Sequence, residues 1–146
     1  AYERSLERQA PAMQLTAAAC PSFVPLVERG VTAGAEIERA AKDYLAPLLA
    51  AEIDTLILGC THYPLLAGLL QLVCGPDVVL VSSAEETAKD VYAVMTERGL
   101  AAPTGEAKHT FLSTGDAARF AELATVFLGP EIDSASVTAL SEAAWS

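Results

Sequence analysis

The residues best suited to chemistry are a cysteine, a threonine and a histidine in the run 58–64, Leu-Gly-Cys-Thr-His-Tyr-Pro. A cysteine thiolate is both a nucleophile and a base. His62 could act as proton partner to the Cys60 sulfur, and Thr61 offers a hydroxyl and a backbone N–H to a substrate carboxylate. Gly59 lets the backbone turn sharply and approach a ligand closely. The pattern indicates a thiol-based active site.

The elements on either side of this run would place the cysteine at a cleft. Residues 55–58, Thr-Leu-Ile-Leu, predict a central parallel strand buried on both faces. Residues 64–73 predict an apolar helix with Pro64 in its first turn. Ligands of open α/β sheets bind beyond the carboxyl ends of the strands, and a helix N-terminus there favours the thiolate. The alternative is that Cys60 is a small buried hydrophobe, which is commoner for a lone cysteine.

The rest of the chain alternates short apolar runs with amphipathic segments, which predicts an α/β fold with three layers, a mostly parallel sheet flanked by helices. Pro47 is expected to bend or end a helix. Ser82 or Ser83 is expected to cap another, with Glu85 or Glu86 completing a capping box. Helices are predicted at 2–9, 23–29, 35–49, 83–98 and 116–128, further strands at 13–19, 78–81 and 109–113, a loop at 100–107, and loose order at the end of the chain.

Composition narrows the class of protein. The 146 residues are 52% hydrophobic and 19% charged, which suits a domain with a real core. The formal net charge of −10 argues against binding nucleic acid or an anionic membrane surface. There is no bilayer-spanning run and no apolar segment of the signal-peptide kind near the start. An odd number of widely spaced cysteines fits a reducing, cytoplasmic setting.

The other candidate residues have ordinary structural explanations. Glu28 ends a short amphipathic helix, where most acids are merely solvated. Cys20 and Cys74 are expected to be packing residues, and His109 a surface or edge residue. No metal is expected, because Cys60 and His62 lack further ligands at suitable spacing. Neither a phosphate-binding loop nor a dinucleotide fingerprint is present.

Three co-linear blocks resemble glutamate racemase: residues 20–30 (Cys-Pro-Ser-Phe-Val-Pro-Leu-Val-Glu-Arg-Gly), 58–66 (Leu-Gly-Cys-Thr-His-Tyr-Pro-Leu-Leu) and 81–87 (Val-Ser-Ser-Ala-Glu-Glu-Thr). The resemblance implies a racemase that needs no cofactor, interconverts L- and D-glutamate, and supplies D-glutamate for peptidoglycan. Two cysteines act on opposite faces of the substrate α-carbon in that family.

Roles carry over by matching motifs. Cys60 matches the thiol that acts on the L-isomer, and Thr61 matches a substrate contact. His62 matches a residue that binds substrate and assists the cysteine, and Glu28 an acid that tunes that histidine. In aspartate-racemase relatives a glutamate typically occupies the position of His62, so this residue favours glutamate as substrate.

The chain departs from the family pattern because it lacks the Asp-Ser-Gly loop and the Cys-Asn-Thr motif of the N-terminal half. It is therefore expected to be a fragment: residues 1–99 would form most of the second domain, and 100–146 a segment that returns to the first. Alone, it is expected to be inactive without the missing N-terminal half. The family commonly forms homodimers. Two alternatives stay open: a related racemase such as aspartate racemase, and a non-catalytic remnant or ligand-binding domain.

Overall fold

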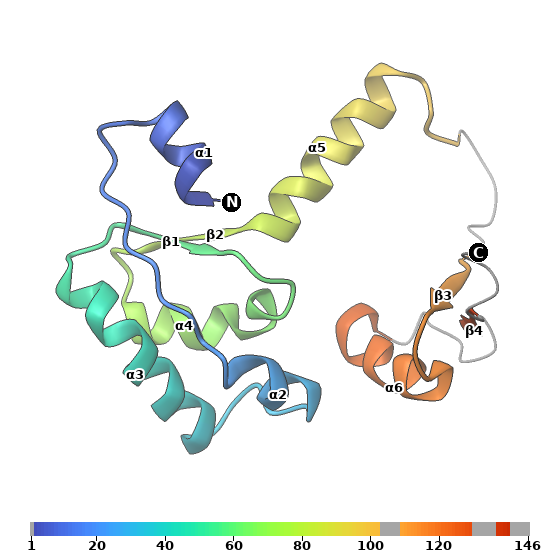
Figure 1. The fold of residues 1–146 in the computed structure, drawn as a ribbon, viewed down its shortest axis with the longest axis horizontal. Helices are drawn as coiled ribbons and strands as arrows, with labels where there is room; N and C mark the ends of the chain where they lie inside the picture. The colour runs from blue at the N-terminus through green and yellow to red at the C-terminus, as the bar shows by residue number, and fades with distance from the viewer. Residues whose placement is uncertain (1, 103–108, 130–136, 141–146) are drawn as a thin grey trace. The chain divides into compact units, whose positions relative to one another are not determined.

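The computed structural model describes residues 2–102, 109–129 and 137–140, and the chain divides into two compact units, Ala1–Glu86 and Thr87–Ser146. Within the described residues, each unit contains a two-stranded parallel sheet together with helices (Figure 1). The α/β class predicted from the sequence is confirmed. No helix among the described residues combines the length and apolar character needed to cross a membrane.

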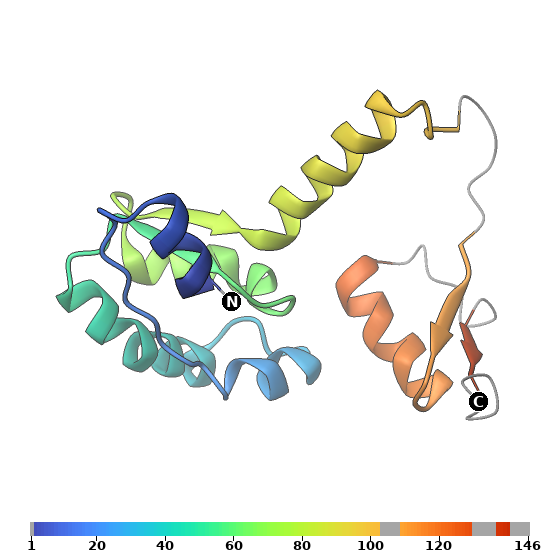
Figure 2. The ribbon, with the colours of Figure 1, turned by 45° about the horizontal axis from the view of Figure 1, so that its top comes forward.

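The first unit carries most of the regular structure. Its strands β1 and β2 run parallel, with Thr55 opposite Val79 and Leu58 opposite Ser82. Helix α4 lies along one face of this sheet in both views, and α3 packs against α4 (Figures 1 and 2). The elements in chain order are α1 (Tyr2–Gln9), α2 (Phe23–Glu28), α3 (Ala35–Ala50), β1 (Thr55–Leu58), the 3-10 helix η1 (Tyr63–Leu66), α4 (Ala67–Cys74), β2 (Val79–Ser82) and α5 (Ser83–Glu97), which continues into the second unit.

The core of the first unit sits on its helical side. The buried stripe of α3 recurs at helical spacing, because residues three or four apart share one face of a helix. The large side chains that are almost completely buried come from α2, α3, η1 and α4: Phe23, Val27, Ile37, Leu66 and Leu70. This side of the unit therefore fixes the positions of α2 and of the connection that follows β1.

The β1–β2 sheet and the segment 13–19 are more exposed to solvent than the sequence suggests. The prediction that residues 55–58 are buried on both faces is wrong: Thr55 is exposed, and of the four residues only Leu58 is buried. The predicted strand at 13–19 is also wrong, since this extended segment pairs with no described strand. Met13 and Leu15 are 56% and 42% exposed. An apolar alternating run becomes a strand only where a neighbour accepts its hydrogen bonds.

Two helix boundaries also differ from the prediction. Pro47 does not end its helix, because α3 runs on to Ala50. The proline stands in the last turn, where a missing N–H removes little of the hydrogen-bond ladder. The predicted helix 64–73 begins instead as η1, and regular α-helix starts only at Ala67.

The start of α5 agrees with the predicted cap. The Ser82 hydroxyl accepts a hydrogen bond from the Glu85 N–H at 3.3 Å, as an N-cap serine does. The Ser83 hydroxyl donates to the Leu58 carbonyl at 2.8 Å, which ties the start of α5 to the end of β1. Helix α5 ends at Glu97, and Gly99 takes a φ of +62°, a conformation that favours glycine.

The second unit contains β3 (Phe111–Ser113), α6 (Ala117–Leu128) and β4 (Val137–Ala139). Asp116 caps α6, because its carboxylate accepts the N–H groups of Ala118 and Arg119. The expected strand and helix in this region are confirmed. The expectation of loose order at the end is wrong at residues 137–139, which pair with β3. Residues 103–108, 130–136 and 141–146 lie outside the described residues.

Candidate functional site

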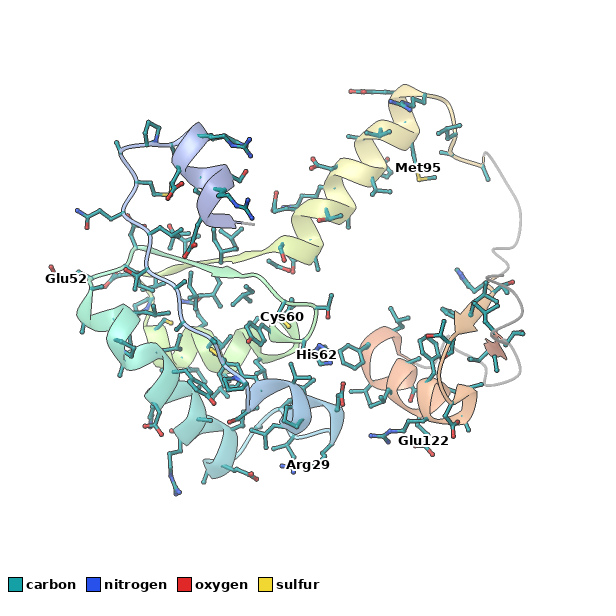
Figure 3. All side chains as sticks on the ribbon, viewed as in Figure 1. Arg29, Glu52, Cys60, His62, Met95 and Glu122 are labelled. Atoms are coloured by element: carbon teal, nitrogen blue, oxygen red, sulfur yellow. The ribbon has the colours of Figure 1, made fainter. Side chains whose placement is uncertain are left out.

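Cys60 lies in the bend between β1 and η1, directly beyond the carboxyl end of a parallel strand. Its thiol is free and partly exposed. Figure 3 labels Cys60 and His62, which both lie on this connection. The alternative of a cysteine buried among aliphatic neighbours therefore does not describe Cys60.

A histidine and a carboxylate meet beside this thiol. The His62 Nε2 atom lies 3.2 Å from Glu28 Oε1, although the two residues are 34 positions apart in the chain. The Thr61 hydroxyl lies 3.2 Å from His62 Nδ1. The His62 and Glu28 side chains are 20% and 39% exposed. The structure thus brings Glu28, Thr61 and His62 into contact at the connection that carries Cys60.

The contacts of the His62 ring suit a group that exchanges protons. Nε2–H can donate to the Glu28 carboxylate whether the ring is neutral or charged. Nδ1 can accept from the Thr61 hydroxyl when the ring is neutral, and donate to it when the ring is charged. The ring can therefore gain or lose a proton at Nδ1 without moving, which a general acid–base group needs.

Aromatic side chains join helix α2, which carries Glu28, to the connection that carries His62. The Phe23 ring of α2 meets Tyr63 and Tyr44 edge-on, at centroid distances of 5.5 and 5.3 Å. The Tyr63 hydroxyl donates to the Cys20 carbonyl at 3.4 Å. The Tyr44 hydroxyl lies 2.7 Å from the Ser22 hydroxyl and accepts the Ser22 N–H at 3.3 Å. Helix α2, and with it Glu28, is thereby fixed to the connection that carries His62.

The sequence gives no local sign of these supporting residues. Ser22 and Tyr44 are 22 positions apart, and Cys20 and Tyr63 are 43 apart. Such contacts depend on how α2, α3 and η1 pack. The one available signal was that Tyr63 directly follows His62 in a block that resembles the racemases.

Cys20, Cys74 and His109 fit their structural explanations. Cys20 is buried, and its thiol donates to the Ala18 carbonyl at 3.8 Å. Burial raises the pKa of the Cys20 thiol, and the charge of Cys60 adds to this, while a hydrogen bond with Tyr63 opposes it. Burial also raises the pKa of Cys74. His109 stacks on Phe111 in the second unit.

The helix N-terminus expected directly after Cys60 is absent from that position. A four-residue 3-10 helix follows Cys60, and α4 begins seven residues after it. The favourable potential of a helix terminus falls off within about one turn. The N-terminus of α4 therefore does not account for a reactive thiol at Cys60. Among the described residues, no three His, Cys, Asp or Glu side chains gather as a metal site would require.

Taken together, the first unit is a parallel α/β unit that carries a partly exposed thiol and a histidine–carboxylate pair on neighbouring segments. No family model matches the chain. The glutamate racemase of Saccharopolyspora erythraea is 56% identical over 124 residues, which are 84% of this chain and 46% of that protein. By sequence and by fold, the chain is a homologue of the glutamate racemases, and it spans about half the length of the curated relatives it matches.

Solved structures agree with the sequence relatives. The chain is similar to the glutamate racemase isoform RacE1 from Bacillus anthracis, with a TM-score of 0.85 and 36% identity over 97% of this chain and 52% of that chain. The glutamate racemase of Francisella tularensis in complex with D-glutamate gives a TM-score of 0.85 at 27% identity, over 96% of this chain and 52% of that chain.

Proposed function

We propose that this chain is the C-terminal half of a glutamate racemase and supplies one of its two catalytic thiols, Cys60. The observation that supports this most directly is the contact between His62 and Glu28, on the connection that presents the partly exposed thiol. These residues belong to a chain that is 56% identical to a glutamate racemase. In the proposal, residues 1–99 form most of one domain and residues 100–146 return to the other.

The proposed reaction is a proton exchange at the α-carbon. The Cys60 thiolate removes the α-proton of L-glutamate, and the electron pair left on the α-carbon is shared with the carboxylate. A thiol from the other half donates its proton to the opposite face, which gives D-glutamate. Cys60 ends as a thiol and its counterpart as a thiolate, so the reverse reaction restores both.

The neighbouring residues would make this step accessible. An ordinary thiol has a pKa of about 8.5, far below that of an amino-acid α-proton. The carbanion-like state therefore needs oriented hydrogen bonds and exclusion of water. Thr61 would hold the substrate carboxylate, and His62 would exchange a proton with the Cys60 sulfur. Glu28 would keep the His62 ring in place through Nε2.

The partner in this proposal is an N-terminal half that carries the second cysteine in a Cys-Asn-Thr motif. The substrate is glutamate, and no cofactor takes part. Such an enzyme would work in the cytoplasm and supply D-glutamate for peptidoglycan, and it would form homodimers. Neither nucleic acid nor a membrane is a partner.

The experiment is reconstitution. The chain would be produced alone and together with the complementary half of the Saccharopolyspora erythraea enzyme, and α-proton exchange would be followed by NMR in D₂O. We expect no racemisation of L-glutamate by the chain alone and measurable racemisation by the pair. Substantial turnover by the chain alone would refute the division into two thiols. A folded complex that is inactive with L-glutamate would refute the racemase proposal, and activity with L-aspartate instead would favour the related racemase.

A further inference from the structure

The main chain turns out of the sheet immediately before Cys60, and a serine from the next strand–helix junction holds it at that point. Leu58, the last residue of β1, is 2% exposed. The Gly59 N–H donates to the Ile57 carbonyl at 3.1 Å, which makes a tight three-residue turn directly after the strand. The Ser83 hydroxyl donates to the Leu58 carbonyl at 2.8 Å. The connection to Cys60 therefore starts from an anchored residue.

The two serines where β2 meets α5 have different partners, although they are neighbours in the chain. The Ser82 hydroxyl accepts the Glu85 N–H at 3.3 Å, so it serves the helix that follows. The Ser83 hydroxyl instead reaches back to β1, 25 positions earlier. Leu58 and Ser82 are paired across the sheet, which brings the first residue of α5 beside the end of β1. A helix cap explains only one of the two hydroxyls.

The far end of the same connection is anchored as well. The Tyr63 ring packs edge-on against Phe23, and its hydroxyl donates to the Cys20 carbonyl. Residues 59–62 thus run between two fixed points, and Cys60 is the second residue of this short run. Each residue of the main chain has only two freely rotating torsions. A shift at the β1 end would therefore be passed directly to the Cys60 sulfur.

We propose that Ser83 is a positioning residue for the reaction of Cys60, an inference that rests on the racemase function proposed above. Its hydroxyl holds the Leu58 carbonyl, and this contact fixes the direction in which the main chain leaves the sheet and presents the thiol. Ser83 itself transfers no proton. A displacement of about 1 Å between reacting groups can lower a rate by about a hundredfold, so a hydroxyl outside the reacting groups can matter to the rate.

The first test compares Ser83→Ala with Ser82→Ala, the matched control that removes the neighbouring hydroxyl. Amide hydrogen exchange of the chain is measured by mass spectrometry on peptides that cover residues 55–66 and residues 80–90. Ser83→Ala should speed exchange in the first peptide roughly fivefold, the factor expected for the loss of one hydrogen bond. Ser82→Ala should speed exchange mainly at the start of α5, where it removes the cap. Equal exchange of residues 55–66 in both variants would overturn the proposal.

The second test measures the kinetics of L-glutamate racemisation by the reconstituted pair. Ser83→Ala should lower kcat roughly tenfold and change KM less, because a displaced thiol weakens the transition state more than it weakens substrate binding. Ser82→Ala should keep kcat within about twofold of the parent value, since a lost cap affects the stability of α5 rather than the thiol. The same kcat in both variants would also overturn the proposal.

The two tests separate the role of Ser83 from the proposed function. An inactive parent pair would refute the racemase proposal, and exchange of residues 55–66 in the chain would then still decide whether Ser83 fixes the connection. An active pair in which Ser83→Ala exchanges and racemises like the control would refute only the role of Ser83.

Discussion

Two turns of the first unit each place a cysteine just before a short helix, and only one of them has the surroundings of a reactive site. Cys20 precedes α2 and is buried, with its thiol directed at a backbone carbonyl. Cys60 precedes η1 and is partly exposed beside Thr61 and His62. A position ahead of a helix therefore does not by itself indicate a catalytic cysteine. The proposal for Cys60 rests on its exposure and on the residues that follow it.

The largest expected effect separates the two cysteines by activity. In the reconstituted racemase, Cys60→Ala should lower the rate of L-glutamate racemisation by roughly a thousandfold or more, because one face of the α-carbon loses its acid–base group. Cys60→Ser should be severely impaired as well, since a hydroxyl is a much weaker acid than a thiol. Circular dichroism of the glutamate solution measures the rate.

Cys20→Ala is the matched control for this experiment. It removes a buried thiol of the same size, so it should lower stability by about 1 kcal/mol while most of the activity remains. Equal loss of activity in both variants, with both proteins folded, would contradict the proposal that Cys60 reacts and Cys20 only packs.

A smaller effect is expected from the carboxylate that holds His62. Glu28→Gln should lower kcat roughly tenfold, because the amide binds the ring less strongly and adds no negative charge. Glu36→Gln is the control, since Glu36 is also a carboxylate paired with a basic side chain, Arg29, but on the surface. The kinetics of both variants would be compared with L-glutamate. An unchanged kcat in Glu28→Gln would show that Glu28 has no role in the reaction.

Thiol labelling tests the same contrast without the second half of the enzyme. Iodoacetamide should modify Cys60 several-fold faster than Cys20 near neutral pH, because the thiolate reacts and burial raises the pKa of the Cys20 thiol above its ordinary value. Peptide mass spectrometry would give the rate at each cysteine. Labelling of Cys20 should rise only at more alkaline pH. Faster modification of Cys20 at neutral pH would contradict the buried position.

The raised pKa of Cys20 also gives the sign of a pH effect on stability. In the unfolded chain this thiol ionises near its ordinary pKa, whereas in the fold it keeps its proton to higher pH. The stabilisation is therefore complete below the ordinary pKa and is lost as the pH rises through the raised one. Urea unfolding of Cys20→Ala should show less loss of stability above about pH 9 than the parent chain does.

The sequence was sufficient for the parts of the fold that local patterns determine. The stripe of α3, the Ser82 cap and the strand at 55–58 follow from spacing and side-chain type alone. The segment 13–19 has the composition of a strand but no described neighbour to pair with, and pairing is not a local property. The same limit explains why burial of β1 was overestimated.

The sequence predicts the residue types of the candidate site but not the aromatic residues that hold them in place. The block 58–64 indicates Cys60, Thr61 and His62 by residue type, whereas only the family resemblance indicates Glu28, which otherwise reads as an ordinary helix-end acid. In the structure, Glu28 Oε1 lies 3.2 Å from His62 Nε2. Long-range packing of Phe23 against two tyrosines brings it there, and no spacing rule predicts such packing.

The smallest expected effect compares the tyrosine hydroxyls that stabilise the Cys20 and Cys60 turns. Tyr44→Phe removes a hydroxyl that contacts both the side chain and the N–H of Ser22, so it should cost about 1 kcal/mol of stability. Tyr63→Phe removes one longer hydrogen bond, to the Cys20 carbonyl, and should cost about half as much. Both rings stay packed against Phe23, so urea unfolding midpoints compare the hydroxyls alone. Because Tyr44 supports only the Cys20 turn and Tyr63 joins it to the Cys60 turn, a larger cost for Tyr63→Phe would show that the two turns are coupled.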